Sequence, residues 1–428
     1  MVVDRRELSS AISGISTRIV KTHTHIDLSN LPIVFLTLYV LVSPLGSLGE
    51  VIALMEGTLR SQSILLGSLG FRYLREFILI LFITSGLVLH LDKGFRPGLA
   101  ILGGILLHLI TIHVLVRMIE YGIFDVYVAA GIRWFSPVLI PFALHRLANK
   151  HSLQPVTNAL LVVFLVHFVL QIVQFFGKSY WYGPSFLGMG SRAPGVFLIP
   201  NTGAFFSLVV AIFSDYYSNL RRCIKILIRL LVTVSVFLTA SGAGYGAIVL
   251  YWVIHYFGRK YRKPSLLVMP LMLGALIFIL PVVSGRGSQY LSKSGLTRVE
   301  ILANALRDAG FYSMGFGSAT NTIVLYAKRS MDTIHTASAE SFYASVVFNF
   351  GWSGLLLLIG LLILGIVYAY RNNNMPFLLF FVILVIFSGT SLVTEVRPAG
   401  IMAIVGISWA YFEQLRKNRS QDAKPHKA

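Results

Sequence analysis

Residues 157–176, which read TNALLVVFLVHFVLQIVQFF, decide the fold class because they contain no Asp, Glu, Lys or Arg. About 20 apolar helical residues cross a bilayer core about 30 Å thick, so this run is typical of a membrane-spanning helix. Similar runs recur along the chain and predict an all-α, polytopic membrane helix bundle. We expect about twelve transmembrane helices, at residues 31–46, 74–91, 97–116, 122–144, 157–176, 196–214, 225–241, 243–257, 264–283, 342–368, 376–391 and 398–413.

The composition of the whole chain agrees with this class. Of 428 residues, 56% are apolar and 12% are charged, whereas soluble domains carry about 25% charged residues. The mean hydropathy is +0.75. These values exclude a soluble enzyme, a disordered chain and a fibrous protein. The single cysteine, Cys223, excludes a disulfide framework and a thiolate metal cluster.

The distribution of charge predicts how the chain is oriented. A net charge of +19 would indicate nucleic acid binding in a soluble protein, but here most of the 36 Lys and Arg fall on one side of the predicted spans. Basic loops mark the cytoplasmic side, so we expect both termini in the cytoplasm and no nucleic acid partner. The predicted organisation is a cytoplasmic tail (1–30), nine spans (31–283), a large external loop (284–341), three spans (342–413) and a basic cytoplasmic tail (414–428).

Two connections are informative. Only residues 241–244 separate the seventh and eighth predicted spans, so we expect a tight helical hairpin there. The external loop at 284–341 is long, and loops of this length are usually functional or disordered. Its apolar residues at 299, 302, 306 and 309 share one helical face, which predicts an amphipathic helix on the outer side of the bundle.

Arginines on the predicted outer side contradict the positive-inside preference, so they require a reason. Guanidinium groups bind phosphate oxygens bidentately and stay charged, so the set predicts a site for a lipid-linked pyrophosphate. For any one arginine, snorkelling to the interface is the favoured alternative. The outer aromatic residues, Tyr182 among them, suit either sugar rings or the membrane boundary. The arginines are Arg192, Arg286, Arg298, Arg307 and Arg397.

Two residues near the end of the long loop are candidate general bases. Glu340 lies where the chain re-enters the membrane, and a partly desolvated carboxylate there is suited to accept a proton. Its alternative role is to stabilise the N-terminus of the following helix. His335 is nearby and is either the base or an exposed loop histidine.

Four short motifs occur in a characteristic order. They are Arg192 before Pro200-Asn201, the small-residue hairpin at 239–244, Arg298 opening a helix before Gly315-Phe316-Gly317, and Glu340-Ser341 followed after an apolar helix by Gly351-Trp352-Ser353-Gly354. On these motifs, and in its architecture, the chain resembles the O-antigen polymerase and O-antigen ligase family of bacterial inner-membrane glycosyltransferases. The motifs span residues 192–354, and the architecture covers most of the chain.

The resemblance implies a C-type glycosyltransferase-like fold and a metal-independent transfer at the periplasmic face, without a cofactor. The donor would be an undecaprenyl-pyrophosphate-linked oligosaccharide, and the acceptor a sugar hydroxyl of another lipid-linked repeat unit. The other implied partners are membrane lipids and a chain-length regulator protein. In this assignment Glu340, His335 and Arg298 are catalytic, and Arg192, Arg286, Arg298, Arg397 and Tyr182 bind substrate.

Two departures from the family pattern affect the assignment. Glu340 stands where the ligases carry a histidine, which favours a polymerase. Gly242 stands where family hairpins often have an arginine, which leaves one phosphate contact to Arg286 or Arg397.

Three alternatives remain open at this point. They are a ligase that transfers the glycan to lipid A-core, a transporter of the lipid-linked sugar, and a non-catalytic chain-length partner. Transporters tend to have repeated halves, and no such repeat is visible here.

Overall fold

The computed structural model describes residues 30–55, 62–88, 103–105, 136–145, 147–177, 192–197, 199–260, 342–388 and 397–422. The described residues form helices joined by turns, with no strand among them, so the all-α prediction is confirmed for this part of the chain. The helices are α2 (Leu31–Val42), α3 (Leu45–Met55), α4 (Gln62–Val88), α7 (Leu147–Lys150), α8 (Gln154–Phe176), α9 (Pro200–Tyr217), α10 (Arg222–Thr239), α11 (Gly242–Lys260), α16 (Phe342–Asn372), α17 (Met375–Ser388) and α18 (Ala399–Asp422).

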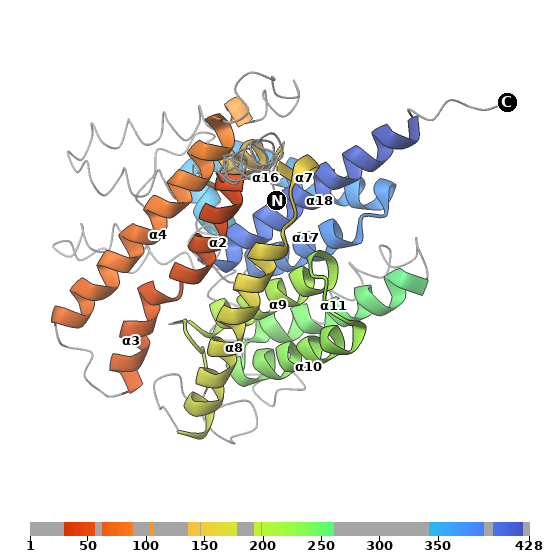
Figure 1. The fold of residues 1–428 in the computed structure, drawn as a ribbon. Helices are drawn as coiled ribbons and strands as arrows, with labels where there is room; N and C mark the ends of the chain where they lie inside the picture. The colour runs from red at the N-terminus through yellow and green to blue at the C-terminus, as the bar shows by residue number, and fades with distance from the viewer. Residues whose placement is uncertain are drawn as a thin grey trace, which may run out of the picture.

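Helix α9 lies at the centre of the described bundle and packs against α8, α10, α11, α17 and α18 (Figure 1). It begins at Pro200, a residue suited to the first helical turn because that turn leaves N–H groups without intrahelical partners. Every residue from Thr202 to Asp215 is buried. Phe205 stacks on Phe387 of α17 with ring centroids 4.6 Å apart. A helix buried on all sides fixes the positions of its neighbours.

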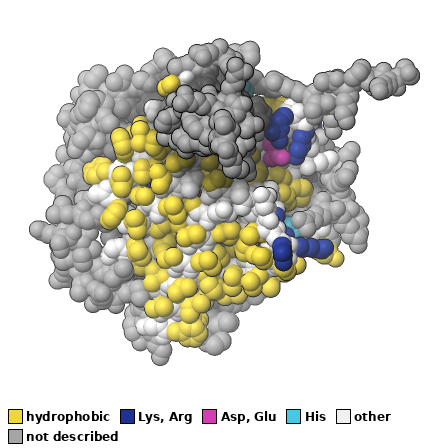
Figure 2. Space-filling model, in the orientation of Figure 1, with side chains coloured by type: hydrophobic (Ala, Val, Ile, Leu, Met, Phe, Trp, Pro, Cys, Tyr) yellow, Lys and Arg dark blue, Asp and Glu magenta, His cyan; other side chains and the backbone are white. Residues whose placement is uncertain are grey.

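The outward faces of the surrounding helices are apolar. Val162, Leu165 and Val169 of α8 and Leu227 and Leu230 of α10 are all exposed. Figure 2 shows a broad apolar face, with the visible described Lys and Arg gathered at its right-hand edge. An apolar surface of this extent suits contact with lipid rather than water.

Three described helical segments are long and apolar enough to cross a membrane: Leu31–Gly49, Gln154–Phe176 and Gly351–Ala369. A shorter apolar helix covers Met375–Ser388. The structure therefore supports a membrane protein. The count of twelve spans stays a prediction, because residues 264–283 and most of 97–116 and 122–144 lie outside the described residues.

Two predicted spans are interrupted by single residues. The sequence predicts one helix at 31–46, but α2 ends at Val42 and α3 begins after Pro44, which lacks the N–H that a continuous helix needs. In α16, Gly351 has φ 68° and ψ −159°, a region that essentially only glycine adopts, so the helix is kinked there.

Other helix boundaries also differ from the predicted spans. Helix α4 starts at Gln62, well before the predicted start at residue 74, and α18 continues to Asp422, past the predicted end at 413. Both extensions contain charged residues, so a search for apolar runs ends before them. The hairpin predicted at 241–244 is present, since α10 ends at Thr239 and α11 begins at Gly242.

Candidate functional site

A group of polar residues surrounds the segment 192–197, where α8 ends, α9 begins and α10 ends. The charge pattern predicts that this end of the bundle is external. We call this group the outer network. Its members are His167, Gln171 and Gln174 of α8, Arg192, Ala193, Gly195 and Val196 of the segment, Asn201 and Ser207 of α9, Ser235 and Thr239 of α10, and Ser241.

Two glutamines of α8 hold the backbone of the segment. Gln174 Nε2 donates to the Gly195 carbonyl at 2.9 Å, and the Gly195 N–H donates back to Gln174 Oε1 at 2.7 Å. Gln171 Nε2 donates to the Ala193 carbonyl at 3.0 Å. The Ala193 N–H donates to the Leu238 carbonyl at 2.9 Å. Because buried backbone groups need partners, these bonds fix a non-helical segment inside a helical bundle.

A buried histidine lies behind the segment. The Val196 N–H donates to His167 Nδ1 at 3.3 Å, so Nδ1 is an acceptor and the imidazole proton sits on Nε2. Nε2 lies 3.4 Å from Ser207 Oγ. Ser207 Oγ lies 2.8 Å from Ser235 Oγ, and Ser235 donates to Gln171 Oε1. These hydrogen bonds run from His167 through Ser207 and Ser235 back to Gln171, and they connect α8, α9 and α10 to the segment.

Gly195 allows this close approach between segment and histidine. Its φ is 69°, in the left-handed region that favours glycine. A Cβ on Gly195 would lie 2.1 Å from His167 Nδ1, which no side chain tolerates. Glycine is therefore required at this position by both conformation and space.

Arg192 is half-buried at the start of the segment. Its Nε donates to the Thr239 carbonyl at 3.3 Å, at the C-terminus of α10, where helix carbonyls lack intrahelical partners. Within the described part of the chain its two terminal nitrogens have no partner. The guanidinium is thus oriented through Nε and leaves its outer edge available to a ligand.

The first turn of α3 contacts both the outer network and α4. Ser47 Oγ donates to the Val196 carbonyl at 2.7 Å. Next to it, Arg72 Nε donates to the Gly46 carbonyl at 3.2 Å. One turn further along α4 lie Arg75 and Glu76.

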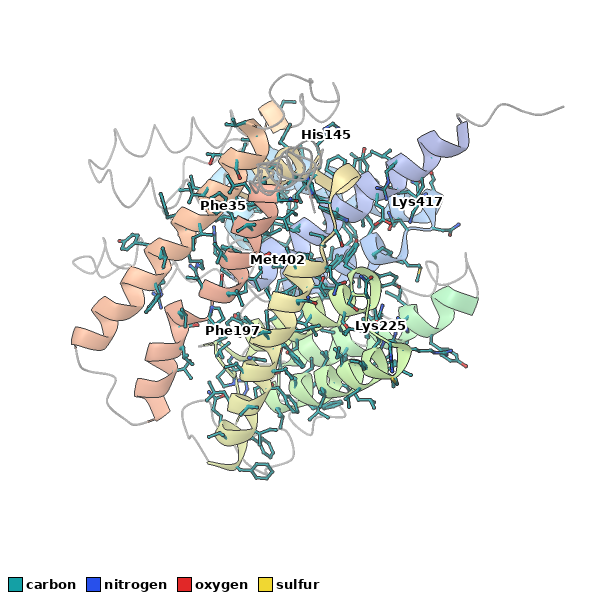
Figure 3. The ribbon with its side chains drawn as sticks, in the orientation of Figure 1. Phe35, His145, Phe197, Lys225, Met402 and Lys417 are labelled. Carbon is teal, nitrogen blue, oxygen red and sulfur yellow. The ribbon has the colours of Figure 1, made fainter. Side chains whose placement is uncertain are left out.

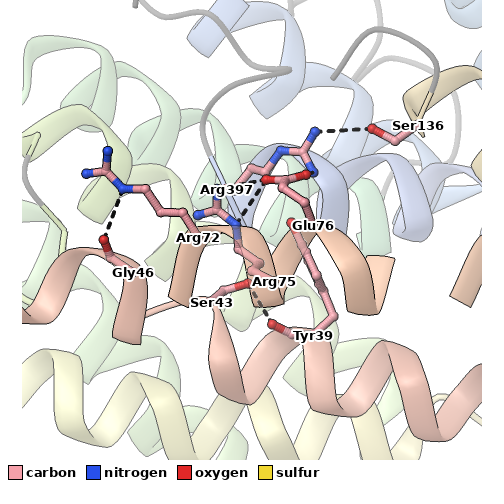
Figure 4. A network of polar contacts seen from close by, with 8 residues as sticks. All are labelled: Tyr39, Ser43, Gly46, Arg72, Arg75, Glu76, Ser136 and Arg397. Atoms are coloured by element: carbon pink, nitrogen blue, oxygen red, sulfur yellow. Dashed lines mark hydrogen bonds and ion pairs between the residues drawn. The ribbon is translucent and has the colours of Figure 1, made fainter. Parts of the chain in front are cut away.

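We call this second group the Arg397 cluster; it comprises Tyr39, Arg75, Glu76, Ser136 and Arg397 (Figure 4). Arg397 is 4% exposed and pairs through Nη1 with Glu76 Oε2 at 2.5 Å. Its Nη2 donates to Ser136 Oγ at 3.2 Å. Arg75 Nη2 contacts the other Glu76 oxygen, Oε1, at 2.8 Å. Arg397 is therefore buried and ion-paired, although it precedes a helix at the predicted outer surface.

A third charged cluster lies at the predicted cytoplasmic end. Asp215 of α9 pairs with Arg229 of α10 at 2.7 Å and accepts a hydrogen bond from the Tyr251 hydroxyl of α11. His255 Nδ1 lies 3.4 Å from the same carboxylate, and Lys225 Nζ donates to the Asp215 carbonyl at 3.0 Å. Figure 3 shows Lys225 on the side of the bundle away from Phe197. This cluster joins three helices by a buried carboxylate.

The two described arginines of the predicted site lie in different clusters. Arg192 contacts Thr239, whereas Arg397 contacts Glu76 and Ser136, and the described residues show no contact between the two arginines. The other predicted site residues lie outside the described residues: Tyr182, Arg286, Arg298, His335 and Glu340. Their roles stay predictions.

Sequence reasoning did not single out several residues of these clusters, although signals for them were present. Arg75 and Glu76 fall inside the predicted span 74–91, and charges within a span often mark functional sites. His167, Gln171 and Gln174 are spaced by four and three residues, which places them on one helix face. That polar stripe predicts a buried partner for α8.

Among the described residues no group of three His, Cys, Asp or Glu is arranged to hold a metal ion. Comparison of the chain with protein-family models, curated proteins and solved structures found no match.

Proposed function

We propose that the protein is a polysaccharide polymerase of the bacterial inner membrane. It transfers a glycan from a polyprenyl-pyrophosphate carrier to a sugar hydroxyl of another lipid-linked repeat unit, at the periplasmic face. The proposal draws on the resemblance of the sequence motifs and on the geometry around Arg192.

The observation that carries the proposal is the way Arg192 is held. Its Nε is bonded to Thr239, while hydrogen bonds from Gln171 and Gln174 fix the segment that follows. The terminal nitrogens of Arg192 have no partner among the described residues. A guanidinium oriented in this way beside an apolar bundle can bind two oxygens of a diphosphate and offset the charge that builds on it as it leaves.

The apolar exterior supports the same substrate class. A polyprenyl tail stays in lipid, so an enzyme that acts on it needs an apolar outer face below a basic site. The exposed side chains of α8, which is hydrogen-bonded to this segment through Gln171 and Gln174, include Val169, Val173 and Phe176. A lipid tail along such a face would bring its diphosphate to the level of Arg192.

The remaining roles follow the sequence assignment. Glu340 or His335 takes the proton from the acceptor hydroxyl, whose oxygen forms the new glycosidic bond. The bond between the donor sugar and its diphosphate breaks, and the diphosphate leaves with the electron pair. Arg298 and Arg286 assist Arg192 in holding that group, and Tyr182 contacts the sugar.

The proposal is tested in a bacterium whose copy of the gene has been deleted. The strain is complemented with wild-type protein, R192A, R192K or the control R222A, which removes an exposed arginine at the predicted cytoplasmic start of α10. Gels of surface polysaccharide should show a ladder with wild type and R222A. We expect no ladder with R192A and a reduced one with R192K, because lysine keeps the charge and loses the bidentate geometry.

A full ladder with R192A would overturn the assignment of Arg192. The deletion strain itself separates polymerase from ligase. A single repeat unit on the acceptor supports a polymerase, whereas long unattached chains would show that the protein is a ligase.

A further inference from the structure

The Arg397 cluster contains two guanidinium groups that share one carboxylate (Figure 4). Glu76 Oε1 accepts from Arg75 Nε at 3.2 Å and Nη2 at 2.8 Å. Its Oε2 accepts from Arg397 Nη1. These three groups together carry a formal charge of +1. Carboxylate and phosphate oxygens accept the same arrangement of guanidinium donors.

Two further polar groups of the cluster are buried without partners. Within the described residues, neither Arg397 Nε nor the Tyr39 hydroxyl has a hydrogen-bond partner. Tyr39 is fully buried and lies within electrostatic range of Arg397, Arg75 and Glu76. Figure 4 shows its ring pointing toward these three side chains. Buried donors without partners are costly, so the cluster has unused capacity to bind an acceptor.

Among the described residues, an excess positive charge distinguishes this cluster from a purely structural ion pair. A water molecule could satisfy one of the free donors, but it would not balance the charge in apolar surroundings. An anion with several oxygens would satisfy the donors and balance the charge together. The side chains of Arg75 and Glu76 are 13% and 18% exposed, so the cluster is open on their side.

We propose that Arg75, Arg397 and Tyr39 form a second anion site, for a phosphate-type ligand, and that the Glu76 carboxylate occupies it when the ligand is absent. The identity of the ligand rests on the proposed function. A polymerase joins two lipid-linked units, each with its own diphosphate, and therefore needs a second diphosphate site apart from Arg192.

The separation of the two clusters fits this division of roles. Arg192 and Arg397 share no contact within the described residues, yet the first turn of α3 is bonded to Val196 through Ser47 and to Arg72 through Gly46. Arg72 lies one helical turn before Arg75 and Glu76 on α4, so both sites lie near the start of α3.

The test uses the purified full-length protein in detergent and measures the shift in unfolding temperature on adding inorganic pyrophosphate. All variants are made both in the wild-type protein and in R192A, which removes the first site. In R192A, pyrophosphate should still raise the unfolding temperature. E76Q should lower the pyrophosphate concentration needed by about tenfold, because a competing charge is gone.

Y39F is the sharpest variant. The Tyr39 hydroxyl is buried without a partner among the described residues, so its removal should not lower the unfolding temperature without ligand. It should nevertheless raise the pyrophosphate concentration needed by about tenfold. E413Q is the control, since Glu413 pairs with Lys417 at a distant, more exposed position and should behave as the parent protein.

The same titration in nanodiscs distinguishes two sources of the phosphate. If pyrophosphate binds in phosphatidylcholine discs but not in phosphatidylglycerol discs, an anionic lipid headgroup is the competing occupant. If pyrophosphate binds in both, the natural ligand is a diphosphate. Either result supports the anion site. Pyrophosphate responses of E76Q and Y39F equal to that of the parent would overturn it. Long unattached chains in the deletion strain would overturn the proposed polymerase function without changing these binding results.

Discussion

At the scale of single residues, the backbone conformation of Gly195 sets the position of Arg192. The segment can lie against His167 only because no Cβ intervenes, and Gln174 then bonds both backbone groups of Gly195. The orientation of a charged side chain is thus controlled by a neighbour three positions away that carries no side chain.

We expect G195A to lower the free energy of unfolding by about 2 kcal/mol or more, because alanine is strained at positive φ and its Cβ overlaps His167. Thermal or denaturant unfolding in detergent measures the effect. G242A is the matched control, since a Cβ there has no neighbour within 4 Å. Equal stability of the two variants would contradict the described packing of the segment.

The buried carboxylate of Asp215 has a structural role that can be measured separately. D215A leaves Arg229 buried without its acceptor and should lower the free energy of unfolding by about 3–5 kcal/mol. The exposed Glu413–Lys417 pair provides the control, and E413A should cost less than about 1 kcal/mol. If D215A were as mild as E413A, the cluster would not tie α9, α10 and α11 together.

At the scale of helices, turns are set by particular residues rather than by overall hydropathy. The α10–α11 hairpin closes through Ala240, which has φ 48° and so adopts the left-handed conformation more usual for glycine. Ser241 supports the turn, since its Oγ accepts from the Gly244 N–H and donates to Asn201 Oδ1.

A240G should therefore stabilise the protein, by roughly 0.5–1 kcal/mol, because glycine removes the strain of the left-handed conformation. The same substitution inside α11, A247G, should destabilise it by about 1 kcal/mol. Opposite shifts of the unfolding midpoint support the hairpin geometry. A loss of stability in both variants would contradict it.

Much of the helical pattern could be predicted from sequence, because apolar runs of spanning length are local signals. The bends could not be predicted in the same way. Pro44 and Gly351 each stand within a run that reads as one helix, and average hydropathy is insensitive to one residue. The extension of α4 back to Gln62 is not predicted by hydropathy either, since it includes the charged residue Arg72.

At the scale of the whole molecule, contacts between distant parts of the chain lay beyond sequence reasoning. Arg397 and Glu76 are 321 positions apart, and their pairing depends on how the turn before α18 meets α4. The sequence predicts that the external arginines act at one site. In the structure Arg192 belongs to the outer network and Arg397 to a separate cluster. What sequence could supply was the class of site, because arginine on the external side needs an anionic partner.

The predicted orientation can be tested with the native cysteine. Cys223 is exposed near the start of α10, on the predicted cytoplasmic side. A membrane-impermeant maleimide should label it in inside-out vesicles and not in right-side-out vesicles. A C223S/S179C variant, with its cysteine in the predicted external loop, should show the reverse. Labelling of both proteins from the same side would contradict the topology.

The polymerase activity is tested most simply by chain growth with the pure protein. Wild-type protein in liposomes is supplied only with lipid-linked repeat units, and the lengths of the glycans and the released polyprenyl diphosphate are measured. We expect a ladder of longer lipid-linked glycans, with one diphosphate carrier released for each bond formed. Repeat units that stay single, with no carrier released, would contradict it.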